Sequence, residues 1–183
     1  MLDNADAYIW AYPVFENTTF NNENLFTGYS SGHEKQSLMI FDIEPTPQCY
    51  QDETARAANG LVHGSLRYVT RGNWATYLIS PTVINTLKTN IYAGQNIYVG
   101  QAIITRLNST VDIDIVLSGG WGLDPTETNA VKIQGYTSTP PAANPAPGQF
   151  TTYKGNGLAN ITVPYFAYYG IYLDVRKLIT CPE

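Results

Sequence analysis

One stretch of the chain alternates so regularly that it restricts the fold more than any other feature. Over residues 110–117, with the sequence TVDIDIVL, apolar and polar side chains exchange at nearly every position. Because successive side chains of a strand point to opposite faces, the apolar residues from Val111 to Leu117 share one face, and Asp112 and Asp114 share the other. The pattern predicts a strand with one buried and one wet face, ended by the glycine-rich turn at residues 119–122.

Weaker versions of this alternation recur along the chain, separated by Gly, Pro and Asn. They cover residues 8–15, 38–43, 61–69, 74–79, 97–105, 131–136, 158–166 and 171–175. Many short strands joined by turn residues are typical of all-β proteins. We therefore expect a single antiparallel β-sandwich or barrel.

Only two stretches favour helix. Residues 52–58, DETARAA, have the composition of one or two helical turns that Gly60 would end. Ser80 and Pro81 have the residue types of an N-cap and a first helical position, which predicts a second short helix over residues 82–88.

A proline-rich segment stands apart from the strands. Residues 137–148, TSTPPAANPAPG, contain four prolines and no large apolar side chain. Such a composition predicts an exposed, semi-extended loop, which acts either as a plain connector or as a contact loop against a neighbouring subunit.

The totals restrict the kind of protein. At 20.2 kDa the chain is long enough for one domain with a substantial core. Its net charge is −5, and its Lys and Arg residues are scattered, so it has no basic stripe to neutralise phosphates. We expect contact with RNA only through a partner. No run approaches a membrane span, and the N-terminus lacks the pattern of a signal peptide.

Few residues are suited to chemistry. His33-Glu34 lacks the second His of a zinc-protease helix, because position 37 is Ser, and His63 falls in a predicted strand. Asp112 and Asp114 are explained by a solvated strand face, although paired carboxylates also bind cations. Cys49 and Cys181 match no metal spacing and are either free thiols or one bridge. We expect no catalytic set, cofactor or metal, and hence no enzyme.

Three aromatic residues and three glycosylation triplets remain. Trp10, Trp74 and Trp121 have the chemistry of a sugar-stacking platform; we expect Trp74 in the core and Trp121, on its glycine turn, at the surface. The triplets at Asn17, Asn108 and Asn160 matter only in a secreted chain.

Three segments, in order, resemble the jelly-roll capsid proteins of picornavirus-like (order Picornavirales) virions. Residues 30–38, SSGHEKQSL, are similar to the Gly-Glu-x-x-x-Ser-Leu/Phe-Arg stretch, although His33 interrupts the Gly-Glu pair and Met39 replaces the Arg. Residues 62–68, VHGSLRY, are similar to the Arg-Gly-Ser-Leu-Arg-Tyr strand, with His63 in place of the first Arg. Residues 161–166, ITVPYF, resemble the late Val/Ile-Pro-Tyr strand.

The resemblance implies a single jelly-roll domain over residues 1–183 that assembles with related capsid chains into an icosahedral shell around an RNA genome. It implies assembly in the host cytoplasm, a place in the virion, a possible host receptor and no membrane or cofactor. The family usually has a longer N-terminal arm and more chain after the Pro-Tyr strand. In such a fold Pro164 fits a strand edge or bulge and not a central ladder.

The expected inter-subunit contacts are the proline-rich loop, the loop of residues 119–128 and both termini. The residues we single out for contact are Trp121, Pro140, Pro141, Pro145, Pro147, Tyr168 and Tyr169.

An alternative interpretation is a secreted carbohydrate-binding or adhesion module, also a β-sandwich. The opening, residues 5–15 and 37–43, is similar to bacterial surface sandwich modules that begin with Asp-Ala-Tyr and a Phe-Asp strand. Exposed, coplanar Trp10 and Trp121 would favour this alternative. A hydrolase has the least support, because no nucleophile is paired with a base.

Overall fold

A computed structural model describes residues 47–59, 66–72 and 74–182 of the chain. The chain divides into two units, residues 1–48 and 49–183, and the fold described below is that of the second. Trp10, His33, His63 and the predicted strands 8–15 and 38–43 lie outside the described residues. The prediction of one domain over residues 1–183 stays a prediction.

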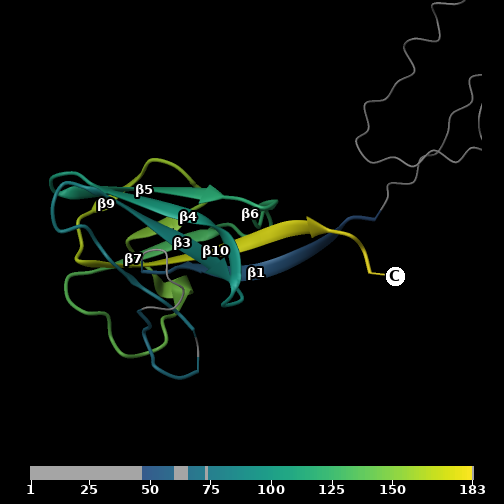
Figure 1. Ribbon diagram of the computed structural model, residues 1–183, viewed down its shortest axis with the longest axis horizontal. Helices are drawn as coiled ribbons and strands as arrows, with labels where there is room; N and C mark the ends of the chain where they lie inside the picture. The colour runs from purple at the N-terminus through teal and green to yellow at the C-terminus, as the bar shows by residue number, and fades with distance from the viewer. Residues whose placement is uncertain (1–46, 60–65, 73, 183) are drawn as a thin grey trace, which may run out of the picture. The chain divides into compact units, whose positions relative to one another are not determined.

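The described residues form an antiparallel β-structure (Figure 1). The strands are β1 (Cys49–Ala57), β2 (Leu78–Ile79), β3 (Thr86–Ala93), β4 (Ile97–Arg106), β5 (Thr110–Leu117), β6 (Trp121–Leu123), β7 (Val131–Tyr136), β8 (Tyr153–Gly155), β9 (Ile161–Pro164) and β10 (Tyr168–Ile179). The predicted all-β sandwich class is therefore confirmed.

The ten strands belong to one sheet that nearly closes on itself. Its main path runs β8-β7-β10-β1-β3-β4-β5-β9, and β2 and β6 pair with β10 off this path. Strands β8 and β9 stand at opposite ends of the path, yet only residues 156–160 connect them. Such a short link requires the two edges to lie close together, so the sheet curls into a sandwich-like barrel. The Ile115 N–H donates to the Leu158 carbonyl within this link (2.6 Å) and helps to hold it against β5.

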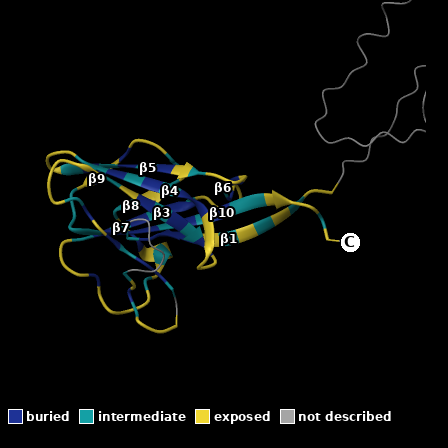
Figure 2. Cartoon of the chain, viewed as in Figure 1, coloured by how far each residue is buried: buried dark blue, intermediate teal, exposed yellow. Residues whose placement is uncertain are grey.

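The core lies inside the curled sheet (Figure 2). On β5 the predicted face is buried, with Val111 and Ile113 at 0% and Ile115 at 4% exposure, whereas Asp112 and Asp114 lie on the half-exposed face. The long strand β10 shows the same period, since alternate residues from Tyr169 to Val175 are buried. Alternation therefore separates core from solvent, as expected for a sheet with one covered face.

Both helix predictions are wrong. Residues 52–58 belong mainly to β1, which pairs with β10 along most of its length and with β3 at its end. Ala55 and Ala57 are fully buried there. Residues 82–85 form a loop, and residues 86–88 begin β3. The one helical turn in the described part of the chain is a 3-10 turn at Pro147–Gln149.

Most strand predictions in the described part are confirmed, with shifted ends. The stretches 97–105, 110–117, 131–136 and 171–175 coincide with strands, whereas only Leu78–Ile79 of the stretch 74–79 and Ile161–Pro164 of the stretch 158–166 are strand. Arg67, from the described end of the stretch 61–69, makes an isolated bridge with Thr76. Pro164 ends the edge strand β9, as its lack of an N–H requires.

Cys49 and Cys181 form a disulfide, which settles the alternative that the sequence left open. Their Cα atoms are 5.0 Å apart, and 132 positions separate them in sequence. The register between β1 and β10 pairs Cys49 with Ile179, so the bridge links the last pair of the two strands to Cys181, two residues beyond the end of β10. The disulfide therefore links the first described strand covalently to the segment that follows the last one.

Candidate functional site

An open pocket of about 480 Å³ lies on the outer face of the sheet, below the proline-rich loop. We call it the Tyr172 pocket. Its lining residues come from β1, β7, β10 and the adjoining loops: Thr54, Arg56, Trp74, Glu127, Lys132, Pro145, Pro147, Gly148, Tyr172 and Asp174. This is the volume of a pocket for a small organic molecule.

Strand register explains why charged side chains gather there. Arg56 on β1 and Lys132 on β7 are both direct partners of Tyr172 on β10, one on each side. Their neighbours in the strands, such as Ala55 and Leu173, point the other way into the core. Cross-strand partners share one face of a sheet, so Arg56, Tyr172 and Lys132 form a row on the outer face.

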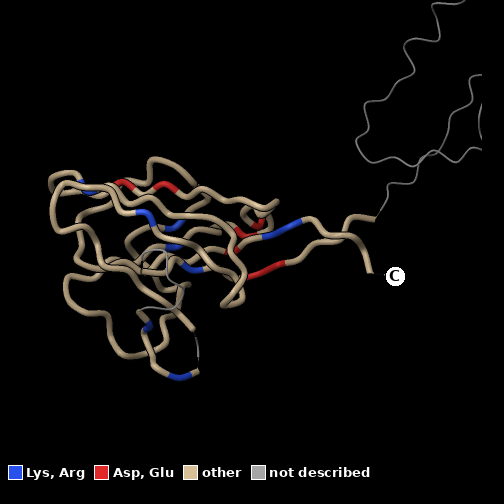
Figure 3. Tube along the Cα trace, viewed as in Figure 1, with Lys and Arg blue, Asp and Glu red and all other residues tan. Residues whose placement is uncertain are grey.

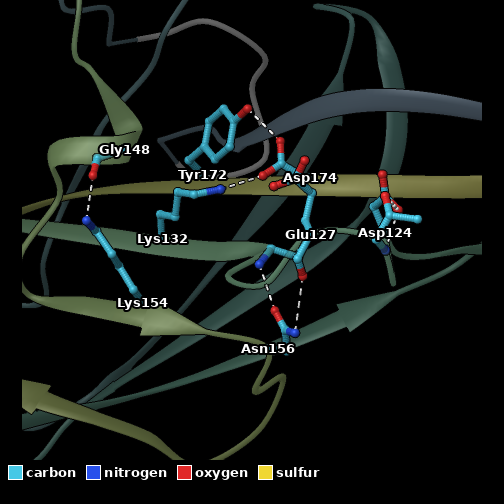
Figure 4. A network of polar contacts seen from close by, with 10 residues as sticks. Asp124, Glu127, Lys132, Gly148, Lys154, Asn156, Tyr172 and Asp174 are labelled. Atoms are coloured by element: carbon cyan, nitrogen blue, oxygen red, sulfur yellow. Dashed lines mark hydrogen bonds and ion pairs between the residues drawn. The ribbon is translucent and has the colours of Figure 1, made fainter.

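Tyr172 and Asp174 organise this row (Figure 4). Lys132 Nζ lies 2.5 Å from one carboxylate oxygen of Asp174, and the Tyr172 hydroxyl donates to the other at 2.6 Å. Lys132 Nζ also lies 5.0 Å from the centre of the Tyr172 ring. Burial and the hydrogen bond to Asp174 raise the pKa of Tyr172, which therefore stays a neutral donor. The Asp174 charge is thus already met by two partners.

Arg56 differs from Lys132 because none of the carboxylates in the described part of the chain pairs with it. Its side chain is only 6% exposed, and its guanidinium carbon lies 4.7 Å from the centre of the Tyr172 ring. Nε is buried without a hydrogen-bond partner, and within the described residues Arg56 makes no ion pair. Desolvation by burial lowers its pKa. Stacking on an aromatic face compensates part of this desolvation.

Hydrogen bonds hold the pocket walls (Figure 4). Lys154 Nζ donates to the Gly148 carbonyl and so fixes the end of the proline-rich loop. On the opposite wall, Asn156 accepts from the Ala130 N–H at 2.7 Å and donates to the Glu127 carbonyl at 3.3 Å. The Glu127 side chain remains exposed at the rim.

A second charged cluster lies beside β6. Arg176 on β10 pairs with Asp52 at 2.5 Å and with Asp124 at 3.3 Å. Thr126 donates to Asp124 through its N–H and its hydroxyl, and these bonds lower the pKa of the Asp124 carboxyl. In this cluster one arginine serves two carboxylates, and the contacts tie β1, β10 and the residue after β6 together. Charges elsewhere on the described trace are sparse (Figure 3).

A second hollow, of about 360 Å³, lies beside the loop of residues 80–85, which we call the Val83 loop. Arg106 fixes this loop: its guanidinium donates to the carbonyls of Pro81 (3.3 Å) and Thr82 and stacks on Tyr165, 3.8 Å from the ring centre. On the loop Val83 is 65% and Ile84 71% exposed. These are the two most exposed large apolar side chains among the described residues.

The expected contact residues divide into buried and accessible ones. Trp121 is 8% exposed, so its predicted place at the surface is wrong: it begins β6, pairs with Lys177 and faces the core. Tyr169 is fully buried, and Pro140 is buried as well.

The remaining four contact residues are reachable. Pro141 is exposed, and Pro145, Pro147 and Tyr168 are half-buried. Pro145 and Pro147 line the Tyr172 pocket, which their sequence pattern did not indicate. The prediction of an exposed loop holds for residues 137–139, 141–144, 146 and 148.

Asp112 and Asp114 have ordinary partners. The Thr162 hydroxyl donates to Asp112 and the Asn160 N–H to Asp114, both at 2.7 Å. The pair thus serves the junction between β5 and β9. No group of three or more acidic, His or Cys side chains placed to hold a metal occurs among the described residues.

Comparisons of the chain with family models, with curated proteins and with solved structures found no match. Within residues 47–59, 66–72 and 74–182, no helix has the length and apolar character needed to cross a membrane.

Proposed function

We propose that this chain is a structural subunit whose function is to assemble with related chains, in a capsid as the sequence resemblance implies. The observation that carries the proposal is the Val83 loop, which presents Val83 and Ile84 to solvent at 65% and 71% exposure. Apolar side chains grouped and exposed in this way favour a protein contact.

The loop is held in place before any partner binds. Arg106 donates to two of its backbone carbonyls and is itself stacked on Tyr165. A contact surface that is already ordered loses less conformational entropy on association. This favours a docking element over a flexible connector.

The charge distribution supports the same role. Arg176, Lys132 and their acidic partners form pairs within the fold, and charged residues are 14% of the chain. The cores of protein interfaces are depleted of charge and enriched in aromatic residues. Many modest contacts of this kind, repeated by symmetry, would stabilise a shell.

The kind of assembly rests on the resemblance alone: an icosahedral particle that encloses RNA, is assembled in the host cytoplasm and contains related jelly-roll chains. The disulfide is compatible with a mature virion, because such bonds persist on virion surfaces and are rare in the reduced cytosol. The bond would then form after assembly.

The test compares self-association of the full chain with that of Val83→Thr/Ile84→Thr, by light scattering coupled to size-exclusion chromatography over a range of concentrations. We expect wild type to form concentration-dependent oligomers and the double variant to stay monomeric. Val116→Thr is the matched control, since Val116 is 53% exposed on β5. A monomeric wild type, or equal loss in the control, would contradict the proposal. Electron microscopy of the natural source then asks whether the chain sits in a closed particle.

The alternative, a secreted carbohydrate-binding or adhesion module, is favoured by one observation. The Cys49–Cys181 disulfide is of the kind that forms in oxidising, extracellular compartments. Trp121 cannot contribute to the expected sugar-stacking platform, because it is buried. Binding of the monomeric chain to a neutral glycan array, without self-association, would favour this alternative over the capsid proposal.

A further inference from the structure

We propose that the Tyr172 pocket binds a small organic carboxylate, whose two oxygens pair with the guanidinium of Arg56. This inference goes beyond assembly and does not depend on it. It starts from a cation that is 94% removed from solvent and lacks an anionic partner among the described residues.

An unpaired buried cation is costly, and stacking on Tyr172 offsets only part of that cost. Buried polar groups without partners are few in folded proteins, so each one calls for an explanation. Nε of Arg56 is sealed and unpartnered, whereas its two Nη groups are not sealed in this way. Because Arg56 lines the pocket, the Nη groups are the donors that a ligand can reach.

The other charges of the pocket select the charge of the ligand. Asp174 is neutralised by Lys132 at 2.5 Å and by the Tyr172 hydroxyl at 2.6 Å. Within the described residues Arg56 is thus left without an ion-pair partner of its own, while the exposed Glu127 carboxylate lies at the rim. A single negative charge balances Arg56, whereas a dianion such as phosphate carries a second negative charge that the Glu127 carboxylate would repel.

The shape of the guanidinium and the volume of the pocket restrict the chemical class of the ligand further. A guanidinium presents parallel N–H groups that match the two oxygens of a carboxylate. The remaining wall contains Trp74, Pro145 and Pro147, which offer apolar faces to the rest of the ligand. A pocket of about 480 Å³ holds a single sugar acid or an acylated amino acid.

The experiment uses saturation-transfer NMR and calorimetric titration of the full chain with two probes, glucuronate and N-acetylglycine. We expect at least one to bind, and the preferred probe identifies the source of the carboxylate. Inorganic phosphate is the third arm and should bind at least about tenfold more weakly, since it adds charge that the pocket repels.

Substitutions assign binding to the pocket. Arg56→Gln should weaken binding by about tenfold or more, and Arg56→Lys by less, because it keeps the charge and loses the planar fork. Arg71→Gln, which removes an exposed arginine and hence the same charge, should leave affinity unchanged. Glu127→Gln should tighten binding a few-fold by removing the repulsion at the rim. Misfolding cannot produce a gain in affinity, so Glu127→Gln keeps the proposal testable if Arg56→Gln is unstable.

Three results would overturn the proposal. The first is that neither glucuronate nor N-acetylglycine binds to wild type. The second is binding that folded Arg56→Gln retains in full. The third is phosphate binding as tightly as the carboxylates, which would show that the pocket charges do not select a monoanion.

Discussion

Removal of the Cys49–Cys181 bridge is expected to destabilise the second unit by about 5 kcal/mol. The perturbation is Cys49→Ser/Cys181→Ser, which removes the bond and leaves no free thiol among the described residues. The bridge spans 132 positions, and the loop-closure entropy withheld from an unfolded chain by a loop of that length amounts to about 5 kcal/mol at 25 °C.

The structure indicates that this effect acts mainly on the unfolded state. The side chains around the bridge are exposed, with Leu178 at 51% and Ile179 at 38%, so its loss removes little packing. For a unit of this size the expected fall in Tm is about 10–20 °C. The unfolded variant is also less compact, so the dependence of the unfolding free energy on urea should become steeper.

The assay is urea unfolding at equilibrium, followed by tryptophan emission in a Trp10→Phe background so that only Trp74 and Trp121 report. Wild type in reductant should match the double variant, and the double variant should not respond to reductant. Thr180→Ser, an exposed substitution beside the bridge, should leave the midpoint unchanged. An unfolding free energy within about 1 kcal/mol of wild type would refute the entropic reasoning.

Three further predictions concern the packing of the sheet. Tyr169→Phe should lower the free energy of unfolding in urea by about 1–3 kcal/mol. The Tyr169 hydroxyl donates to the Pro164 carbonyl at 2.6 Å and accepts from the Phe166 N–H at 3.0 Å, and the variant leaves both backbone groups unpaired. An unchanged midpoint would contradict this prediction. Gly100→Ala should lower the free energy of unfolding by about 1–3 kcal/mol in the same assay. The φ of Gly100 is +153°, and an added Cβ would lie 2.1 Å from the Val116 carbonyl oxygen. Gly148→Ala is the control, because an added Cβ there meets open space. Burial raises the pKa of Tyr169 to about 12, so its contribution to stability is complete below pH 10 and lost as pH rises through 12; absorbance titration of tyrosinate should show this late ionisation, and Tyr169→Phe should remove it.

The sequence predicted the strands where local pattern and tertiary environment agree. On β5 the alternation from Val111 to Ile115 is also the division between core and solvent, because the strand has one covered face. Pro164 was expected at an edge, and it ends β9 at the end of the sheet path. In both cases the sheet offers one suitable position: alternation fits a strand with one covered face, and a proline fits an edge strand.

Prediction failed where non-local pairing outweighed local preference. Residues 52–58 have helix-forming composition, but hydrogen bonds to β10 and β3 make them a strand. Trp121 follows glycines with positive φ, which suggested an exposed turn, yet pairing with Lys177 turns its ring into the core. The Tyr172 pocket was missed altogether, since Arg56, Lys132 and Tyr172 come from three separate segments.

The amino-acid sequence by itself determined that the second unit is an antiparallel β-structure with a buried apolar face, because a period of two has no other stable use in a folded chain. It also determined how few charges the molecule has to distribute. Only the tertiary structure decided which thiols form a bond, which aromatic rings are covered and which of the described cations make no ion pair. Those properties depend on strand register between residues far apart in sequence, 132 positions for the two cysteines, and no local pattern encodes a register across such distances.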